Sequence, residues 1–364
     1  MSQSTDLPTY RKLAQRLDTI PNGFPSTQSG VELKLLAKLY TPEQAKLAAV
    51  MRLTPEPAEA IAARVGWEPA AAYNALKDMA RLGLIRAQRG EQGLTFGLMP
   101  FVVGVYESQL ARMDEELAQL FEAYFQESFG REVLSTPPSV HRIIPVEQSI
   151  PVDLEVFPYE RASQLLEGAN SFGVRDCICR VEKRLLGQGC DHPVENCLVF
   201  HPAEHAFERS RTIRTISKEE ALRILRQATE AGLVHSSANV QKGHGYICNC
   251  CTCCCGILRG LTEFGNAEAM ARSNFHAAVD GDLCIACASC LEVCPFGALS
   301  LPGDIVEVDL GRCMGCGLCV PACPSEALSL RRKPEAEITP PPLDEEAWLM
   351  ERARKRGVPL HEIL

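Results

Sequence analysis

The spacing of apolar residues predicts a compact helical region over residues 30–100. Thr41-Pro42 supplies an N-cap followed by proline at the first helical position, and Thr54-Pro55 repeats this signal before a second helix. An alanine-rich helix is predicted over residues 67–84, and two short apolar runs around residues 90–93 predict a hairpin. This region is therefore expected to hold three helices and a terminal hairpin.

A longer amphipathic segment covers residues 101–129. Its apolar positions fall on one helical face, which predicts a helix that packs on a neighbouring element or on a second subunit. The residues of this face are Leu110, Met113, Leu117, Leu120 and Tyr124.

The second half of the chain begins with a proline-rich stretch. Five prolines between Ser135 and Pro158 favour turns or short strands, because proline lacks the backbone N–H that a helix needs. We place a domain boundary there. Beyond it, a helix is expected near residues 159–170, and Ser217 with Glu220 predicts a capped helix that ends at Gly232.

Length and composition indicate how many globular units the chain forms and to which broad class of protein it belongs. The chain has 364 residues, more than one hydrophobic core normally serves, and its 46% apolar and 23% charged residues are ordinary for a globular protein. The N-terminus lacks the apolar stretch of a signal peptide, and no segment approaches the roughly 20 apolar residues of a membrane helix. We therefore expect a cytoplasmic protein of two or three globular units, without membrane insertion.

These patterns predict an α+β, multidomain architecture. The expected parts are an N-terminal arm (1–29), a helical domain with the amphipathic helix (30–134), a cysteine-rich middle domain (135–274), a small domain built on a cysteine repeat (275–330) and a charged, proline-rich tail (331–364). The tail is interpreted as a solvated strap.

Cysteine is the unusual component of this sequence. All 18 cysteines lie between Cys177 and Cys323, so the two halves of the chain carry different chemistry. Because thiols stay reduced in the cytoplasm, dense cysteine favours metal ligation over disulfides. The net charge of -9 disfavours tight non-specific binding to nucleic acid or anionic lipid.

The most specific motif is a repeat of C-x2-C-x2-C-x3-C-P. It runs from Cys284 to Pro295 and again from Cys313 to Pro324. This spacing lets a tight loop present three thiolates to three corners of an iron-sulfur cubane, while the fourth ligand must come from elsewhere. Four-cysteine zinc sites favour two separated C-x2-C pairs instead.

The repeat resembles bacterial-type two-cluster ferredoxins, in which the fourth cysteine of each run binds the other cluster. The resemblance covers residues 275–330 and implies two 4Fe-4S clusters. It implies that one cluster is bound by Cys284, Cys287, Cys290 and Cys323, and the other by Cys294, Cys313, Cys316 and Cys319. Small residues inside both loops leave room for backbone N–H groups to approach the clusters.

A second group of cysteines precedes this repeat. Four cysteines and a histidine within 21 positions are enough for one metal site: Cys177, Cys179, Cys190, His192 and Cys197. Arg180 can offset the negative charge of thiolate ligands there. An iron-sulfur cluster, a zinc ion and ordinary buried thiols all stay open for this group.

A third group packs six cysteines into eight positions: Cys248, Cys250, Cys251, Cys253, Cys254 and Cys255. A helix would place Cys248, Cys251 and Cys255 on one face, whereas a strand would alternate them. One cubane cannot use six ligands, so the run can bridge two centres, share one with the preceding group or hold an unusual cluster. The expected additional cofactors are therefore one or two further iron-sulfur clusters or zinc.

The N-terminal helices and hairpin resemble a winged helix-turn-helix domain. Residues 30–100 hold nine Lys/Arg and seven Asp/Glu, a net of +2, which is little for contacts with phosphates. DNA is therefore not expected as a partner. We interpret the domain as a module for protein docking or dimerisation, which includes a homodimer through this region.

Together these features predict an iron-sulfur electron-transfer protein that exchanges electrons with a partner oxidoreductase. The sequence contains no nucleotide-binding or nucleophile motif, so no catalytic residue is assigned, and a carrier or oxidoreductase subunit is favoured over a stand-alone enzyme. Two alternatives stay open: a redox-sensing iron-sulfur transcriptional regulator, and an oxidoreductase whose active metal site lies in the middle domain.

Overall fold

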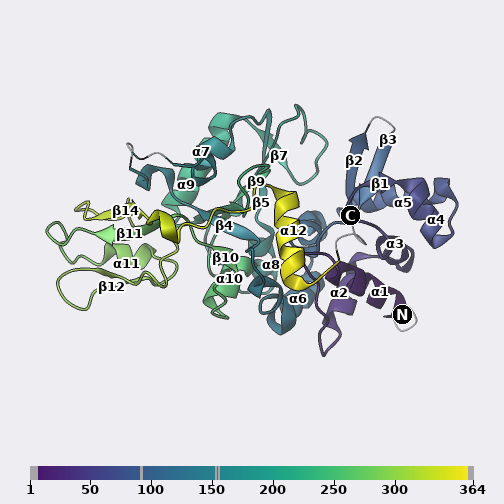
Figure 1. The fold of residues 1–364 in the computed structure, drawn as a ribbon, viewed down its shortest axis with the longest axis horizontal. Coiled ribbons are helices and arrows are strands. Elements are labelled where there is room, and N and C mark those ends of the chain that lie inside the picture. The colour runs from purple at the N-terminus through teal and green to yellow at the C-terminus, as the bar shows by residue number, and fades with distance from the viewer. Residues whose placement is uncertain (1–6, 91–92, 152–153, 155, 360–364) are drawn as a thin grey trace. The chain divides into compact units, whose positions relative to one another are not determined.

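The computed structural model describes residues 7–90, 93–151, 154 and 156–359. These residues form both helices and strands, in agreement with the α+β class (Figure 1). The chain divides into two compact units, of which the first comprises residues 1–137, 181–188 and 349–364, and the second residues 138–180 and 189–348. The finer five-part division stays a prediction.

The first unit holds the helical N-terminal region. Its elements are α1 (Leu7–Asp18), α2 (Val31–Leu39), α3 (Pro42–Ala48), β1 (Glu56–Pro57), α4 (Ala58–Val65), α5 (Pro69–Arg81), β2 (Arg86–Gly90), β3 (Gly93–Gly97), α6 (Glu115–Tyr124) and the short helical turns η1 (Phe101–Val105), η2 (Tyr106–Arg112), η3 (Phe125–Phe129) and η4 (Val133–Ser135). The stretch expected to be an arm instead contains α1, which buries Leu13 and Leu17 because its apolar positions share one face.

Local signals account for much of this unit. Thr41 caps α3 and forms a capping box with Gln44, as the sequence predicted. Strands β2 and β3 form the predicted hairpin. The Thr54-Pro55 cap was wrong, since Pro57 precedes α4 and β1 pairs with β3.

The predicted continuous helix over residues 101–129 was also wrong. The chain breaks at Met113, which is extended, and Asp114 then caps α6 by accepting a hydrogen bond from the Leu117 amide. Leu117, Phe121 and Tyr124 of α6 and η3's Phe125 are buried. The amphipathic pattern therefore marked a buried face but not the helix boundaries.

The second unit is built on a seven-stranded sheet of order β10-β4-β8-β9-β6-β5-β7. Its elements are β4 (His141–Ile144), η5 (Glu147–Ser149), η6 (Pro158–Glu160), α7 (Ala162–Leu165), β5 (Ser171–Asp176), β6 (Glu195–His201), β7 (Arg214–Ile216), α9 (Lys218–Glu230), β8 (Val234–Ala238), β9 (Tyr246–Cys250), α10 (Gly256–Thr262) and β10 (Met270–Ala271). Helix α8 (Ile178–Leu185) begins in this unit and ends in the first. The helix expected over residues 159–170 is reduced to the short η6 and α7.

One face of this sheet forms the core with α9. Ser217 caps α9 through the Glu220 amide, as predicted. The buried side chains of this core include Val174, Leu198 and Ile247 from three neighbouring strands. Because side chains alternate along a strand, residues next to these three point to the opposite face.

The cysteine repeat forms a small substructure within the second unit. It consists of β11 (Phe275–Val279), α11 (Ser289–Val293), β12 (Leu299–Ser300), β13 (Glu307–Val308) and β14 (Leu328–Arg332), followed by η7 (Glu335–Glu337). β11 pairs with β14, and β12 pairs with β13. Buried Glu160 anchors this substructure, since its carboxylate accepts from Asn274 at 2.7 Å and pairs with Arg332 at 3.1 Å.

The C-terminal tail is not the solvated strap that the sequence predicted. It forms α12 (Glu345–Arg356), whose Arg352 is fully buried in the first unit. The Arg352 guanidinium donates to the backbone carbonyls of Pro21, Val133 and Thr136. Among the described residues, no helix combines the length and apolar character needed to cross a membrane.

Replacing Arg352 by alanine is expected to destabilise the protein by about 2–5 kcal/mol, because three buried carbonyls would lose their donor. Arg354→Ala removes an exposed arginine two residues away and is expected to change stability by less than about 0.5 kcal/mol. Urea unfolding followed by circular dichroism measures both. Equal midpoints for the two variants would contradict this role of Arg352.

Candidate metal centres

The eight cysteines of the repeat line two small cavities. One cavity is lined by Cys294, Cys313, Cys316 and Cys319. The other is lined by Cys284, Cys287, Cys290 and Cys323. Each set combines three cysteines of one motif with the last cysteine of the other. The ligand assignment itself stays a prediction, which these two cavities support.

The two motif loops share an unusual backbone conformation. Ala286 and Ala288 have positive φ angles, as do Gly315 and Gly317 at the equivalent positions of the second motif. Gly315 is required, because a Cβ there would overlap the Phe275 carbonyl oxygen and the Ser273 hydroxyl. Backbone amides also point at ligand sulfurs, with Ala277 N donating to Cys313 Sγ at 3.5 Å and Ala298 N to Cys294 Sγ at 3.3 Å.

The second motif loop is buried against the rest of its unit. Val146 N donates to the Cys316 carbonyl at 2.9 Å, and Ser149 Oγ donates to the Gly317 carbonyl at 2.9 Å. Burial raises the pKa of Cys316 to about 12. Met314 is only 2% exposed.

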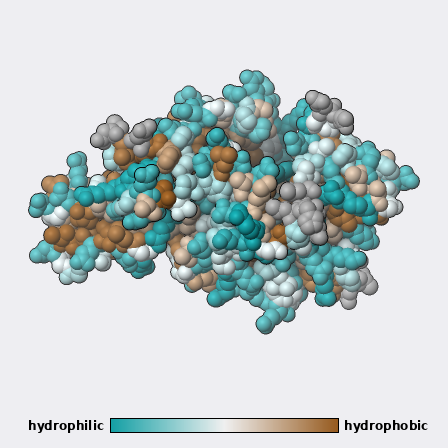
Figure 2. Space-filling view, in the orientation of Figure 1, coloured by the Kyte–Doolittle hydropathy of each residue, from teal (hydrophilic) through white to brown (hydrophobic). Residues whose placement is uncertain are grey.

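The first motif loop faces solvent. Ile285, which corresponds to Met314, is 64% exposed, and Cys287 is exposed as well. A hydrogen bond from Ser289 lowers the pKa of Cys287. Figure 2 shows hydrophobic residues gathered on the surface of the substructure that holds α11 and β12. The two cavities therefore differ in access although their motifs repeat.

Three of the middle cysteines, Cys197, Cys248 and Cys250, lie on the sheet face opposite α9. Strand β6 pairs with β9 so that Leu198 lies opposite Ile247. Cys197 and Cys248, the next residues of this antiparallel pair, are therefore cross-strand neighbours. Cys250 lies two residues along β9 and shares their face. Cys177 directly follows β5, the other neighbour of β6.

Six thiols influence the pKa values of their neighbours in a closed sequence, and we call this group the six-thiol ring. Neighbouring thiols within it interact in the order Cys177, Cys179, Cys255, Cys250, Cys248 and Cys197. Cys197 also lies close enough to Cys177 to raise the pKa of that thiol. Cys250 and Cys255 are buried. The ring therefore joins cysteines from both middle sequence groups.

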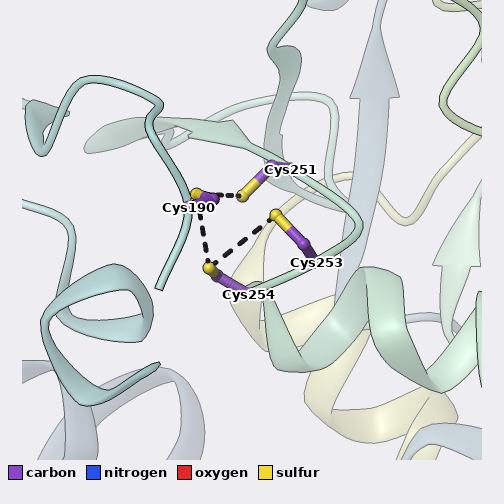
Figure 3. A group of neighbouring side chains, drawn as sticks. All are labelled: Cys190, Cys251, Cys253 and Cys254. Carbon is purple, nitrogen blue, oxygen red and sulfur yellow. Dashed lines mark hydrogen bonds between the residues drawn. The ribbon is translucent and has the colours of Figure 1, made fainter. Parts of the chain in front are cut away.

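The other four middle cysteines form a separate group, the four-thiol site (Figure 3). Their sulfur atoms all lie within 4.8 Å of one another, and the members are Cys190, Cys251, Cys253 and Cys254. Cys190 comes from the loop between α8 and β6, while the other three come from the turn between β9 and α10.

The structure thus divides both sequence groups between two sites. Cys190 separates from Cys177, Cys179 and Cys197, and His192 is not a member of the four-thiol site. The run from Cys248 to Cys255 is neither wholly strand nor wholly helix. It is a strand to Cys250, then a turn, with Cys255 at the N-cap of α10. This change of backbone direction could not be read from cysteine spacing.

Arg180 lies between the two sites and is 1% exposed. Its guanidinium donates to Asn196 Oδ1 and to the Asn249 carbonyl, both at 2.9 Å, and both of these acceptors are uncharged. Although burial opposes it, the sulfurs of Cys177, Cys251 and Cys250 raise the pKa of Arg180. Thiolates are therefore the groups around Arg180 that can balance its buried charge.

Two residues beside the ring gave no signal in the sequence. Ser236 Oγ lies 3.8 Å from Cys250 Sγ and 3.5 Å from Nδ1 of His141. His141 is buried, which lowers its pKa to about 4. Ser236 lies on β8, next to β9 in the sheet order, and His141 lies on β4, next to β8, a placement that only strand pairing reveals.

The donor set of both middle sites fits metal ions. Crowding by neighbouring thiols raises the pKa of Cys177 and of Cys250, so these sulfurs would not ionise readily by themselves. A bound cation replaces the thiol protons and removes the repulsion between sulfurs. Soft thiolates select iron-sulfur clusters, zinc or copper(I) over hard cations.

Gly315→Ala is expected to lower the iron content by about four atoms per chain, because the added Cβ displaces the loop that carries three ligands of one cluster. Ala286→Gly changes the equivalent position of the other motif and should keep all the iron. Iron and acid-labile sulfide assays on protein purified without oxygen measure the effect. Full iron in Gly315→Ala would refute the need for glycine.

Comparison with known families gives a match over part of the chain. Residues 283–327 match the family described as the 4Fe-4S dicluster domain. This comparison lends no support to a winged-helix N-terminal region. No curated protein matches the chain. The chain therefore contains a 4Fe-4S dicluster domain near its C-terminus, which indicates iron-sulfur electron transfer.

Proposed function

We propose that this protein transfers electrons between a partner oxidoreductase and a third redox centre held by the six-thiol ring, through the two clusters of the dicluster domain. The observation that carries the proposal is a continuous connection between the buried motif loop and the ring. Two cubanes would occupy the two four-cysteine cavities and supply one-electron chemistry.

The connection runs along β4. Val146 N, hydrogen-bonded to the Cys316 carbonyl, lies five residues beyond His141 in the chain. His141 lies beside Ser236, and Ser236 beside Cys250 of the ring. Bonded and hydrogen-bonded atoms thus link a ligand of the buried cluster to a thiol of the ring. This favours the buried cluster as the inner relay.

The exposed motif loop is the proposed point of contact with the partner. Leu283 is 49% exposed and Ile285 is 64% exposed, on either side of Cys284. An apolar surface beside an accessible cluster suits a transient contact with another redox protein, because such contacts are small and readily released. Electrons would enter or leave there, and the buried cluster would face the ring.

The ring suits an iron-sulfur centre because of its charge. Several thiolates bound to iron carry a net negative charge, and Arg180 supplies a buried positive charge against them. The Arg180 side chain is held in turn by Asn196, whose carbonyl accepts from Asn249 at 2.6 Å. These residues position a cation and do not donate ligands.

We propose a docking role for the first unit and do not expect DNA as a partner. On α5, Arg81 pairs with Asp78, and in the same unit Arg64 pairs with Glu56. These pairs reduce the positive field that a DNA-binding surface needs. The redox-sensing regulator is therefore the less favoured alternative.

The proposal predicts more than about eight irons per chain, the content of two cubanes. Cys248→Ser should remove the additional iron and leave the ferredoxin-type electron paramagnetic resonance signals intact. Cys316→Ser should remove one ferredoxin signal and slow reduction of the ring centre by an external one-electron donor. Iron analysis, spectroscopy and stopped-flow reduction test these outcomes.

The two variants are matched, since each removes one cysteine from one proposed centre. About eight irons in the unaltered protein, with no loss in Cys248→Ser, would overturn the third redox centre. If Cys316→Ser left the rate of ring reduction unchanged, the proposed route through the buried cluster would be wrong.

Arg180→Gln should make the ring centre harder to reduce, because it removes a buried positive charge that stabilises the more negative reduced state. Arg184→Gln alters an exposed arginine of the same helix and should leave the potential unchanged. Potentiometric titration of each centre gives the readout. An unshifted ring potential in Arg180→Gln, at full iron content, would argue against an electrostatic role.

A further inference from the structure

The four-thiol site is much more compact than a cluster site. The sulfur of Cys190 lies 3.9 Å from that of Cys251 and 3.6 Å from that of Cys254, and the sulfurs of Cys253 and Cys254 are 3.8 Å apart (Figure 3). A disulfide needs sulfurs about 2.05 Å apart, so these are separate thiols.

These distances discriminate between one metal ion and a cubane. A tetrahedral ion with metal–sulfur bonds of about 2.3 Å holds its four sulfurs about 3.8 Å apart, by the geometry of the tetrahedron. In a cubane each thiolate binds a different iron, so its four thiolates must stand around the whole cluster. The observed separations match the single ion.

We propose that Cys190, Cys251, Cys253 and Cys254 bind one zinc ion, and that this site is structural and distinct from the redox centres. Four thiolates close the coordination sphere, as in structural zinc sites, and leave no position for a substrate. Zinc(II) also binds such ligands more strongly than iron(II) does.

The position of this site in the fold gives the ion its role. Cys250 and Cys251 are adjacent in sequence but belong to the ring and to the four-thiol site respectively, and the same holds for Cys255 and Cys254. An ion at the four-thiol site would fix the turn between β9 and α10. It would thereby hold two ring cysteines in position from outside the ring.

The charge of such a site is also accommodated. A zinc ion with four thiolates carries a net charge of about -2. Arg180 lies beside Cys251, and Cys253 is exposed, so that water solvates part of this charge. The site therefore does not need a neutralising ligand such as histidine.

The test is a metal count on full-length protein purified without oxygen, for the unaltered chain and for Cys253→Ser and Cys287→Ser. These variants remove exposed cysteines from the four-thiol site and from the dicluster domain. We expect one zinc per chain in the unaltered protein. Cys253→Ser should lose most of its zinc and keep its ferredoxin signals, whereas Cys287→Ser should lose iron and keep its zinc.

A second measurement does not depend on the folding of a variant. Cells grown with cobalt(II) in place of zinc should yield protein with the visible absorption of a tetrahedral cobalt thiolate. Zinc(II) itself has no d–d transitions and gives no such absorption. The unaltered chain is sufficient for this experiment.

An unaltered protein with iron but no zinc and no cobalt thiolate spectrum would overturn the proposal. A single mononuclear iron lost in Cys253→Ser would overturn the choice of zinc. These results are independent of the proposed electron transfer, which is tested by the iron content of the ring and by the rate of ring reduction in Cys316→Ser. Zinc in the four-thiol site with a ring free of iron would sustain this proposal and reject that one.

Discussion

Neutralisation of sulfur charge in a water-poor interior is the constraint on which the second unit depends. Ten middle cysteines are brought together, neighbouring thiols raise the pKa of Cys177 and of Cys250, and a buried arginine lies among these cysteines without a carboxylate at its hydrogen-bond acceptors. Such an arrangement is costly for free thiols and for an isolated guanidinium. Metal cations remove both costs at once, because they convert thiols to ligated thiolates and give Arg180 its counter-charge.

The sheet makes this crowding possible. α9 covers one face, and the alternation of side chains along β6 and β9 then sends cysteines to the other. The turn after β9 redirects the next three cysteines to a second site, and Cys255 returns to the first as α10 begins. Two sites of different size thus arise from one short sequence run.

The dicluster domain is an integral part of this unit. Its buried motif loop is held by Val146 and Ser149, and its outer strands are anchored by Glu160. The repeated motifs consequently lie in unequal surroundings, one in solvent and one against the sheet. This difference in surroundings defines the path of the proposed electron transfer, which would run from the solvent-accessible cluster to the buried one.

The sequence by itself determined the features that depend on local spacing. The C-x2-C-x2-C-x3-C-P repeat predicted the 4Fe-4S dicluster domain, because a loop of that length sets the positions of three thiolates. The caps at Thr41 and Ser217 and the β2–β3 hairpin were predicted for the same reason, since each is a contact between near neighbours in the chain.

Only the tertiary structure decided how the middle cysteines are shared. Cys190 meets Cys251 across 61 positions, and Cys197 meets Cys248 through strand pairing, so neither contact has a local signal. The buried anchor Arg352 likewise depends on carbonyls more than 200 positions away. The density of cysteines predicted metal binding in this region, and the packing of the strands determined which thiols lie together.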